Sequence, residues 1–534
     1  MYRCSYPGIQ ERNPRLKGAE DAQESLSSRS TTFLWIIISW GVLLRLIPYL
    51  FNRSLWLDES MLALNVINRS FFQLLKPLDY NQGSPLGFLM LERLAVQVFG
   101  TSEYALRLFP LFCGILSILL FYRLAKLCVT PKAVPIALGL FAISGPLVYY
   151  SSEAKQYSSD VAIALLLFSG AIYYKSRELT PRRIAGFGLL GAASVWFSHP
   201  SLFILAGIGT SLTLFCLAGK GWTTRIGSLA IVYSAWALSF ACCYLISLRQ
   251  LSNNQALLYE WSFGFVPSPL LSLVAVDWFI NAFFGIFRKP VGLELTGIAV
   301  LTFLVGCISM FSNKREELFI LMSPILLVLL AAGFHKYPFS ARMLLFIVPG
   351  LLLFIAEGAE EIRCRTRDET PIIGACVIGL LFFHPLLSSS YQLIKPSTGS
   401  LPLGVQSVGH TREEIKPVMN YVKEHEHEGD VLYVFDGAKP AFLYYAPKYR
   451  LNEMNYVLGR ASAWTDHWED YEKDIDQLRG HRRVWLLNTH IRGQEEKFFL
   501  YLLDRRGTRL DYFKSVGAIV YLYDLDQLKP STQR

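Results

Sequence analysis

Charged residues are scarce in this 534-residue sequence: Asp, Glu, Lys and Arg make up 17% of it, whereas hydrophobic residues make up 52%. This composition excludes an intrinsically disordered chain, a collagen and a coiled coil. The sequence also lacks the GxGxxG, P-loop, HExxH and GxSxG signatures. The corresponding dinucleotide, nucleoside phosphate, zinc peptidase and serine hydrolase sites are therefore not predicted.

Cysteine forms no recognisable framework. All nine cysteines precede residue 400, most of them lie within apolar runs, and no two are spaced as CxxC. Neither a disulfide scaffold nor a cysteine-based zinc site is therefore predicted. Within apolar runs, cysteine is more often a small packing residue than a reagent.

The formal net charge of +9 is unevenly distributed along the chain. Residues 400–534 carry 19 Lys and Arg against 20 Asp and Glu, so the basic excess lies in the preceding, apolar part. A basic excess beside apolar runs is typical of the cytoplasmic loops of membrane proteins. We therefore expect membrane lipids, and no nucleic acid, among the partners.

Apolar runs of about 20 residues, the length that spans a bilayer, recur between residues 33 and 391. The first follows a polar stretch of 32 residues without a cleavage pattern, so we expect a retained signal anchor. Eleven crossings are predicted, at residues 33–51, 104–122, 133–150, 157–174, 184–198, 201–219, 226–246, 291–311, 318–334, 343–360 and 371–391.

The distribution of Lys and Arg predicts the orientation of these spans. With the amino terminus in the cytoplasm, the cytoplasmic loops hold 19 Lys and Arg in 73 residues, whereas the outer loops hold 10 in 112. This assignment treats residues 85–100 as a helix in the outer interface, because Glu92 and Arg93 interrupt its apolar sequence. If that segment crossed the membrane, every later loop would change sides.

The carboxyl-terminal part is expected to be an extracytoplasmic α/β domain. Strands are predicted at residues 431–435, 484–488 and 519–523, and amphipathic helices at 411–425 and 468–479. The expected organisation is a polar cytoplasmic amino terminus, a helical membrane module with a first outer loop, and this soluble domain, at residues 1–32, 33–395 (loop 52–103) and 396–534.

Two clusters of acidic residues adjoin predicted spans. Asp58 and Glu59 follow the first span, and Glu153 follows a later one, ahead of Lys155 and Tyr157. Acidic side chains in or beside a membrane are costly and therefore point to a function. The predicted topology places both clusters on the same outer face, where a carboxylate can take a proton from an attacking hydroxyl.

Cationic side chains are expected at the same face. Lys155 belongs to the second acidic cluster, Arg342 precedes the tenth span, and His199 ends an earlier span. Arg binds phosphate oxygens through two hydrogen bonds and Lys offers a point charge, so these residues suit an anionic leaving group. Structural alternatives stay open: solvated acids in the first loop, an ion pair of Glu153 with Lys155, Arg342 as a membrane anchor, and His199 as a satisfied interface histidine.

Four stretches in a fixed order carry a resemblance to a known family. They are WLDES (56–60), NQGSPLGFLML (81–91), FGTSEYALRLFPLFCGILSILLFYRLAK (99–126) and SGPLVYYSSEAKQYS (144–158). In this order they resemble the polytopic GT-C glycosyltransferases, in particular the protein O-mannosyltransferase and aminoarabinose–lipid A transferase group. The similarity covers about residues 33–175, and ARMLLFIVPGLLL (341–353) is similar to the start of a later span of the family.

The resemblance implies a donor sugar on a polyprenyl phosphate, used at the extracytoplasmic face without a nucleotide sugar. By position it implies catalytic acids at Asp58, Glu59 and Glu153, and donor-phosphate contacts at Lys155, Tyr157 and Arg342. The chain departs from the family pattern at two places. Ser84-Pro85-Leu86 replaces the common His-Pro-Pro, which concerns the acceptor, and Met343 replaces the Tyr after the later Arg, which concerns the phosphate.

We therefore predict a glycosyltransferase of the plasma (inner) membrane that moves a sugar from a polyprenyl phosphate to a hydroxyl of a lipid, protein or glycan acceptor, by a single inverting displacement. Asp58 orients or deprotonates the acceptor, and Lys155 and Arg342 stabilise the departing phosphate. No cofactor is identified, although Asp58 and Glu153 form a candidate site for a divalent cation. The alternatives are a secondary transporter or lipid-linked sugar flippase, whose acids would couple to protons, and a receptor built on the C-terminal domain.

Overall fold

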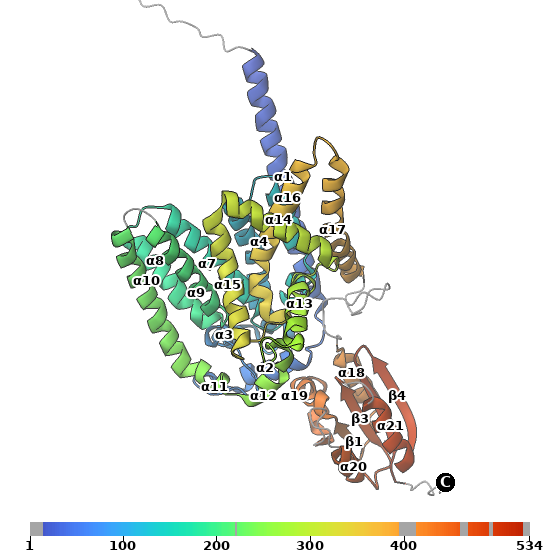
Figure 1. The fold of residues 1–534 in the computed structure, drawn as a ribbon. Helices are drawn as coiled ribbons and strands as arrows, with labels where there is room; N and C mark the ends of the chain where they lie inside the picture. The colour runs from blue at the N-terminus through green and yellow to red at the C-terminus, as the bar shows by residue number, and fades with distance from the viewer. Residues whose placement is uncertain (1–13, 219–221, 395–412, 460–467, 491–494, 527–534) are drawn as a thin grey trace, which may run out of the picture.

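The computed structural model describes residues 14–218, 222–394, 413–459, 468–490 and 495–526. The described residues up to 394 form a bundle of helices, and those from 413 onward form a smaller unit around a β-sheet at one end of the bundle (Figure 1). The amino-terminal end of α1 projects from the opposite end of the bundle (Figure 1). The predicted fold class, a polytopic helical membrane protein with a carboxyl-terminal α/β unit, is confirmed.

Nine helical stretches in the described ranges are long and apolar enough to cross a membrane. They are Thr31–Phe51 of α1 (Pro14–Phe51), α4 (Glu103–Cys128), α7 (Tyr157–Ser176), α9 (Ser201–Ala218), Arg225–Leu251 from α10 (Trp222–Cys243) to α11 (Arg249–Leu251), α14 (Thr296–Asn313), α15 (Arg315–Gly333), Ala341–Arg365 from η4 (Ala341–Ile347) to α16 (Val348–Arg365), and Pro371–Tyr391 of α17 (Pro371–Ile394). The shorter helices of the bundle are α2 (Leu57–Asn68), α3 (Leu86–Phe99), α5 (Ala133–Ile143), α6 (Gly145–Tyr150), α8 (Pro181–Phe197), α12 (Gln255–Glu260) and α13 (Leu273–Arg288).

Two of the eleven predicted spans are shorter helices than expected. The span predicted at 184–198 corresponds to α8, which has 17 residues. The span predicted at 133–150 is divided into α5 and α6, because the backbone of Ser144 is not helical and Pro146 lies in the first turn of the second helix. Both positions are nevertheless helical, so the difference concerns helix length rather than the order of elements.

A buried arginine from the first span stabilises the break between α5 and α6. Arg45 donates to the carbonyl oxygens of Ala142 at 3.1 Å and Phe141 at 3.4 Å, near the carboxyl end of α5. These carbonyls have lost their partners in the next helical turn. The hydroxyl of Ser389 donates to the carbonyl of Ile143 at 2.9 Å in the same way. A charged residue in the middle of the first span is thus explained by the helix end that it caps.

The segment predicted to lie in the interface forms α3. Its 14 residues correspond to about 21 Å of helix, which is too short to cross a hydrocarbon core of about 30 Å. Glu92 lies on its buried face, and neither of its carboxyl oxygens has a hydrogen-bond partner among the described residues. Burial raises the pKa of Glu92 well above its ordinary value.

The carboxyl-terminal unit contains one five-stranded sheet, in the order β2-β1-β3-β5-β4. Its elements are α18 (Ile415–His425), β1 (Val431–Val434), α19 (Lys439–Tyr449), β2 (Asn455–Leu458), α20 (Trp468–Asp476), β3 (Val484–Thr489), α21 (Glu495–Arg506), β4 (Thr508–Ser515) and β5 (Ala518–Asp524). β1 pairs in parallel with β2 and β3, whereas β5 pairs antiparallel with β3 and β4. The three predicted strands are the buried centre of the sheet, β1, β3 and β5.

Candidate active site

The two acidic clusters meet in the structure. α2 begins at Leu57 and carries Asp58 and Glu59 in its first turn, while Glu153 lies in the turn between α6 and α7. The backbone N–H of Ala154 donates to Oε1 of Glu59 at 2.8 Å and joins the two segments directly. The two acidic clusters, which are far apart in the sequence, are therefore adjacent in the structure, as predicted.

Glu59 accepts hydrogen bonds at both of its carboxylate oxygens. Nε and Nη2 of Arg107, on α4, donate to its two carboxylate oxygens at 2.9 and 2.8 Å, and the N–H of Trp56 donates to Oε2 at 3.3 Å. Burial by itself raises the pKa of Glu59, but the charges of Arg107 and Arg53 outweigh burial and leave the pKa below its usual value. Glu59 thus stays ionised and fixes the start of α2.

Asp58 forms an ion pair with Nη2 of Arg342, the second residue of η4. The guanidinium of Arg342 lies over three aromatic rings, with 5.5 Å to the ring centre of Trp56, 5.6 Å to that of Tyr157 and 5.3 Å to that of Trp261. These rings attract the cation electrostatically and orient its plane. Within the described chain, Nε and Nη1 of Arg342 are buried and have no hydrogen-bond partner. The N–H groups on these two nitrogens are therefore available to donate hydrogen bonds to an anionic ligand.

Glu153 is fully buried, and neither of its carboxyl oxygens has a hydrogen-bond partner in the part of the chain that the structure describes. Burial raises its pKa to about 7, with further contributions from the charges of Glu59 and Asp58 and opposition from Arg342 and Arg53. A carboxyl group with this pKa exchanges its proton near neutral pH. Asp58 and Glu153 are thus close enough for the charge of one to shift the titration of the other.

Two more cations surround Glu153. Lys155 is buried, donates from Nζ to Oε1 of Gln82, and has a pKa that burial lowers. Arg53 donates to Oγ of Ser152 at 3.0 Å and lies 4.5 Å above the ring centre of Tyr149. The site therefore combines partly exposed and buried carboxylates with closely spaced positive charges.

The predicted residues differ in how they join this centre. Tyr157 begins α7, and its ring contacts Tyr150 at 5.0 Å between ring centres and packs beneath Arg342. His199 lies between α8 and α9, where burial lowers its pKa to about 4 and leaves the ring neutral. Nε2 of His199 is buried and has no hydrogen-bond partner among the described residues.

Sequence reasoning missed Arg53 and Arg107. Both are almost completely buried beside the acidic clusters. Each lies at the end of a predicted span, so the rule applied to the acids, that a charge beside a span needs a partner, also applied to them. The pairing of Arg107 with Glu59 depends on how α2 and α4 pack and could not be derived from spacing.

Across the described ranges, no group of three or more His, Cys, Asp or Glu side chains is placed to hold a metal ion. Asp58 forms an ion pair with Arg342. The positive charge next to these carboxylates comes from the protein itself.

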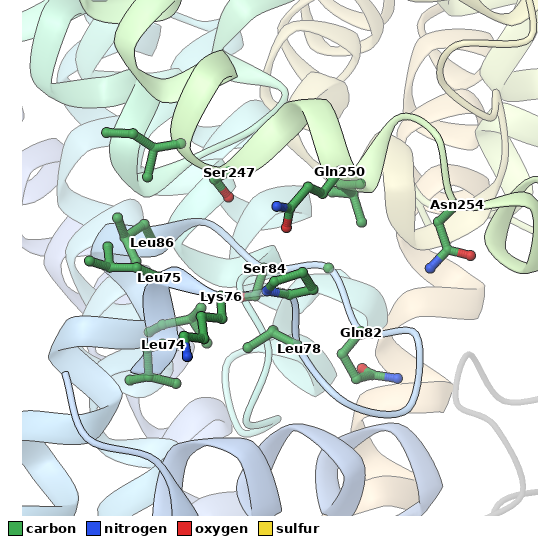
Figure 2. A pocket seen from close by; sticks show the side chains of 15 residues that line it. Leu74, Leu75, Lys76, Leu78, Gln82, Ser84, Leu86, Ser247, Gln250 and Asn254 are labelled. Atoms are coloured by element: carbon green, nitrogen blue, oxygen red, sulfur yellow. The ribbon is translucent and has the colours of Figure 1, made fainter. Parts of the chain in front are cut away.

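A pocket adjoins the centre on the side of Lys155. Gln82, which accepts from Lys155, and Ser84, which donates to Gln156 at 3.3 Å, belong to its lining. Figure 2 shows Ser247 and Gln250 on the helix across the cavity from these residues. Uncharged polar groups thus face each other over a leucine-rich lining that also includes Lys76.

A second cavity lies on the side of Arg342. Ser340 and Ala341, the two residues before Arg342, belong to its lining. The aromatic side chains of the wall are Phe263, Trp278 and Phe339, and the basic ones are Arg288 and Lys289. This lining combines the apolar surface and the positive charge that suit an amphiphilic anion.

Comparison with known proteins shows which solved structures share this fold. No protein-family model and no curated protein sequence matches this chain. The structure is similar to that of ArnT from Cupriavidus metallidurans bound to undecaprenyl phosphate, with 12% sequence identity over 93% of this chain and 98% of the other and a TM-score of 0.54. It is also similar to the Archaeoglobus fulgidus oligosaccharyltransferase in complex with zinc and sulfate, with 14% identity over 93% of this chain and 73% of the other and a TM-score of 0.52. Both are GT-C glycosyltransferases. The resemblance noted in the sequence is confirmed at the level of the fold, and this chain has the fold of the GT-C glycosyltransferases.

Proposed function

We propose that this protein is a membrane glycosyltransferase that moves a sugar from a polyprenyl phosphate to a hydroxyl acceptor. The observation that carries the proposal is the convergence of Asp58, Glu153, Lys155 and Arg342 at one end of the bundle. Two carboxylates for the acceptor and two cations for the departing phosphate are what this reaction requires. The fold supports the proposal, because ArnT, which shares it along nearly its whole length, binds undecaprenyl phosphate.

The reaction is a single displacement at the anomeric carbon. The acceptor oxygen forms a bond to this carbon while the bond from the carbon to the phosphate oxygen breaks, which inverts the configuration. Asp58, the more exposed acid, orients the acceptor hydroxyl, and Glu153 takes its proton. The electron pair of the broken bond stays on the lipid phosphate, where Arg342 and Lys155 stabilise the negative charge.

The cavity beside Arg342 suits the lipid-linked donor. Its wall carries Lys289 and Arg288, which also pairs with Glu294 at 2.7 Å, together with aromatic side chains, so it offers positive charge for a phosphate and apolar surface for a polyprenyl chain. Glu59 holds the α2 turn, and Tyr157 supports the guanidinium plane. His199 is not included in the proposed donor site, because its neutral ring adds no charge there.

We further propose that the centre and the C-terminal unit lie outside the cytoplasm, in the plasma (inner) membrane. The basic loops predicted to be cytoplasmic support this orientation. The position of the sheet unit at the opposite end of the bundle from the start of α1 agrees with it (Figure 1). We keep the domain boundaries predicted from the sequence, 1–32, 33–395 and 396–534, as part of this proposal; α1 runs through the first boundary, and the second lies outside the described residues.

A transfer assay in detergent tests the proposal. Purified full-length protein is incubated with undecaprenyl-phosphate-linked monosaccharides and a membrane extract as the source of acceptors, and mass spectrometry follows free undecaprenyl phosphate and glycosylated products. We expect transfer without a membrane gradient, and Asp58→Asn and Glu153→Gln to lower turnover about 100-fold or more. Glu92→Gln is the matched control, since Glu92 is a buried acid without a hydrogen-bond partner in the described chain, outside the centre.

Two results would contradict the proposal. Near-normal transfer by both Asp58→Asn and Glu153→Gln would remove the acids from the mechanism. Movement of intact lipid-linked sugar across vesicles, without release of undecaprenyl phosphate and only under a proton gradient, would identify a transporter or flippase instead.

A further inference from the structure

The C-terminal sheet unit packs on the loop that carries Asp58. Leu55 and Leu62, from the loop and α2, belong to the same buried apolar cluster as Phe442 and Tyr445 of α19. Apolar surface buried in common makes the two parts one packed body at this point. Figure 1 shows α19 at the edge of the sheet unit nearest to α2.

Side chains of the sheet unit accept the backbone N–H groups of this loop. The N–H of Ser54 donates to Oε2 of Glu414 at 3.1 Å, as does its hydroxyl at 3.0 Å. The N–H of Leu55 donates to the Tyr445 hydroxyl at 2.9 Å. Buried backbone N–H groups need such partners, and here they come from residues about 360 and 390 positions away.

Charged contacts anchor these acceptors. The Tyr445 hydroxyl itself donates a hydrogen bond to Oε1 of Glu103 at 2.9 Å. Glu103 also pairs with Lys448 at 3.1 Å and Lys416 at 3.3 Å, and Nζ of Lys416 donates to the carbonyl of Asn52 at 2.6 Å. The Tyr445 hydroxyl thus both accepts and donates a hydrogen bond, and the two bonds fix its position.

The sheet unit reaches the turn of Asp58 itself. Nδ1 of His490, just after β3, lies 2.6 Å from Oε1 of Glu413, and the imidazole ring centre lies 6.1 Å from that of Trp56. Burial raises the pKa of Glu413, with a smaller contribution from the charge of Asp58. The carboxyl end of β3 therefore forms one wall around the start of α2.

We propose that the C-terminal unit is part of the active site, in which Glu414 and Tyr445 are positioning residues that fix the backbone leading to Asp58. This inference rests on the proposed function, because the position of Asp58 matters for orienting the acceptor hydroxyl. A displacement of a catalytic group by about 1 Å can cost a factor of about 100 in rate. Neither residue needs to touch the substrate.

The test compares the full-length protein with the double variant Glu414→Ala/Tyr445→Phe in detergent. Glu414→Gln is the conservative variant, since its amide oxygen still accepts the Ser54 N–H. Tyr421→Phe is the matched control, because its hydroxyl contacts Asp511 within the sheet unit and not the loop. Hydrogen exchange of peptides covering residues 54–60 is measured beside the thermal midpoint, turnover and the KM for an undecaprenyl-phosphate-linked sugar.

In the double variant we expect exchange at 54–60 to accelerate about tenfold or more and turnover to fall about 10- to 100-fold, with donor KM unchanged and the protein still folded at the assay temperature. Glu414→Gln and Tyr421→Phe are expected to behave as the wild type.

Unchanged exchange at 54–60 in the double variant would overturn the inference whether or not the wild type transfers sugar. Faster exchange with undiminished turnover, or a loss of turnover that only follows a lowered thermal midpoint, would overturn it as well. Absence of transfer by the wild type would refute the proposed function instead, while the exchange data still decide whether the domain fixes the loop.

Discussion

Replacing Glu153 with glutamine is expected to separate catalysis from stability. The carboxyl group is fully buried, its oxygens have no hydrogen-bond partner among the described residues, and its pKa is raised from 4.5 to about 7. The folded protein therefore binds this proton more tightly than the unfolded chain does. The stabilisation that this tighter proton binding gives the folded state is fully present below pH 4.5 and is lost as the pH rises through about 7. The pKa difference corresponds to about 3 kcal/mol.

Glutamine stays neutral at every pH, so the variant escapes this loss. At about pH 8 we expect the free energy of unfolding of Glu153→Gln to exceed that of the wild type by up to about 3 kcal/mol, and the difference to shrink in acid. Turnover of the same variant falls about 100- to 10,000-fold, because the amide cannot accept the proton of the acceptor. Stability and activity thus change in opposite directions.

The assay is thermal unfolding by tryptophan fluorescence across this pH range, with release of undecaprenyl phosphate measured on the same samples. Glu92→Gln, which removes a second buried carboxyl group, is expected to gain stability at high pH and keep its turnover. A Glu153→Gln protein that unfolds below the wild type at about pH 8, or that transfers sugar at the wild-type rate, would refute the reasoning.

Three further results are expected. Turnover of the wild type rises as the pH passes about 7, where Glu153 loses its proton; a rate profile that is flat across this pKa would argue against Glu153 as the base. Turnover persists after incubation with EDTA, because Arg342 and Lys155 supply the positive charge; loss of activity that added Mg²⁺ restores would contradict this. Glu59→Gln lowers the free energy of unfolding by about 3 to 5 kcal/mol, since it breaks the buried pair with Arg107; an unchanged thermal midpoint would show that the pair adds no stability.

The positions of the acids could be predicted because the membrane restricts where charge is tolerated. Asp58 and Glu153 stand out at the ends of apolar runs, and alternating topology brings those ends to one face. The roles of the acids could not be separated in this way. Glu59 and Asp58 are neighbours in sequence, yet Glu59 is enclosed by Arg107 and Ala154, whereas Asp58 faces Arg342.

The carboxyl-terminal unit shows the same limit. Its central strands are continuous apolar runs and were predictable, whereas the edge strands β2 and β4 are largely exposed and contain no long apolar run that would mark them. The contact of Tyr445 with Leu55 joins residues 390 positions apart. Such a contact follows from tertiary packing alone, so the predicted separate domain gave no indication that it holds the Asp58 loop.

Mass spectrometry of the lipids that copurify with the protein in mild detergent tests the donor site most directly. Two nitrogens of Arg342 are buried without a hydrogen-bond partner in the described chain, next to Lys155, and a phosphate would supply the missing acceptors. We expect a polyprenyl phosphate in the wild type and in Arg363→Gln, whose arginine pairs with Glu360 near the far end of α16, and its depletion in a folded Arg342→Gln protein. Absence of polyprenyl phosphate from the wild type, or equal amounts in all three proteins, would contradict a lipid-phosphate donor at this centre.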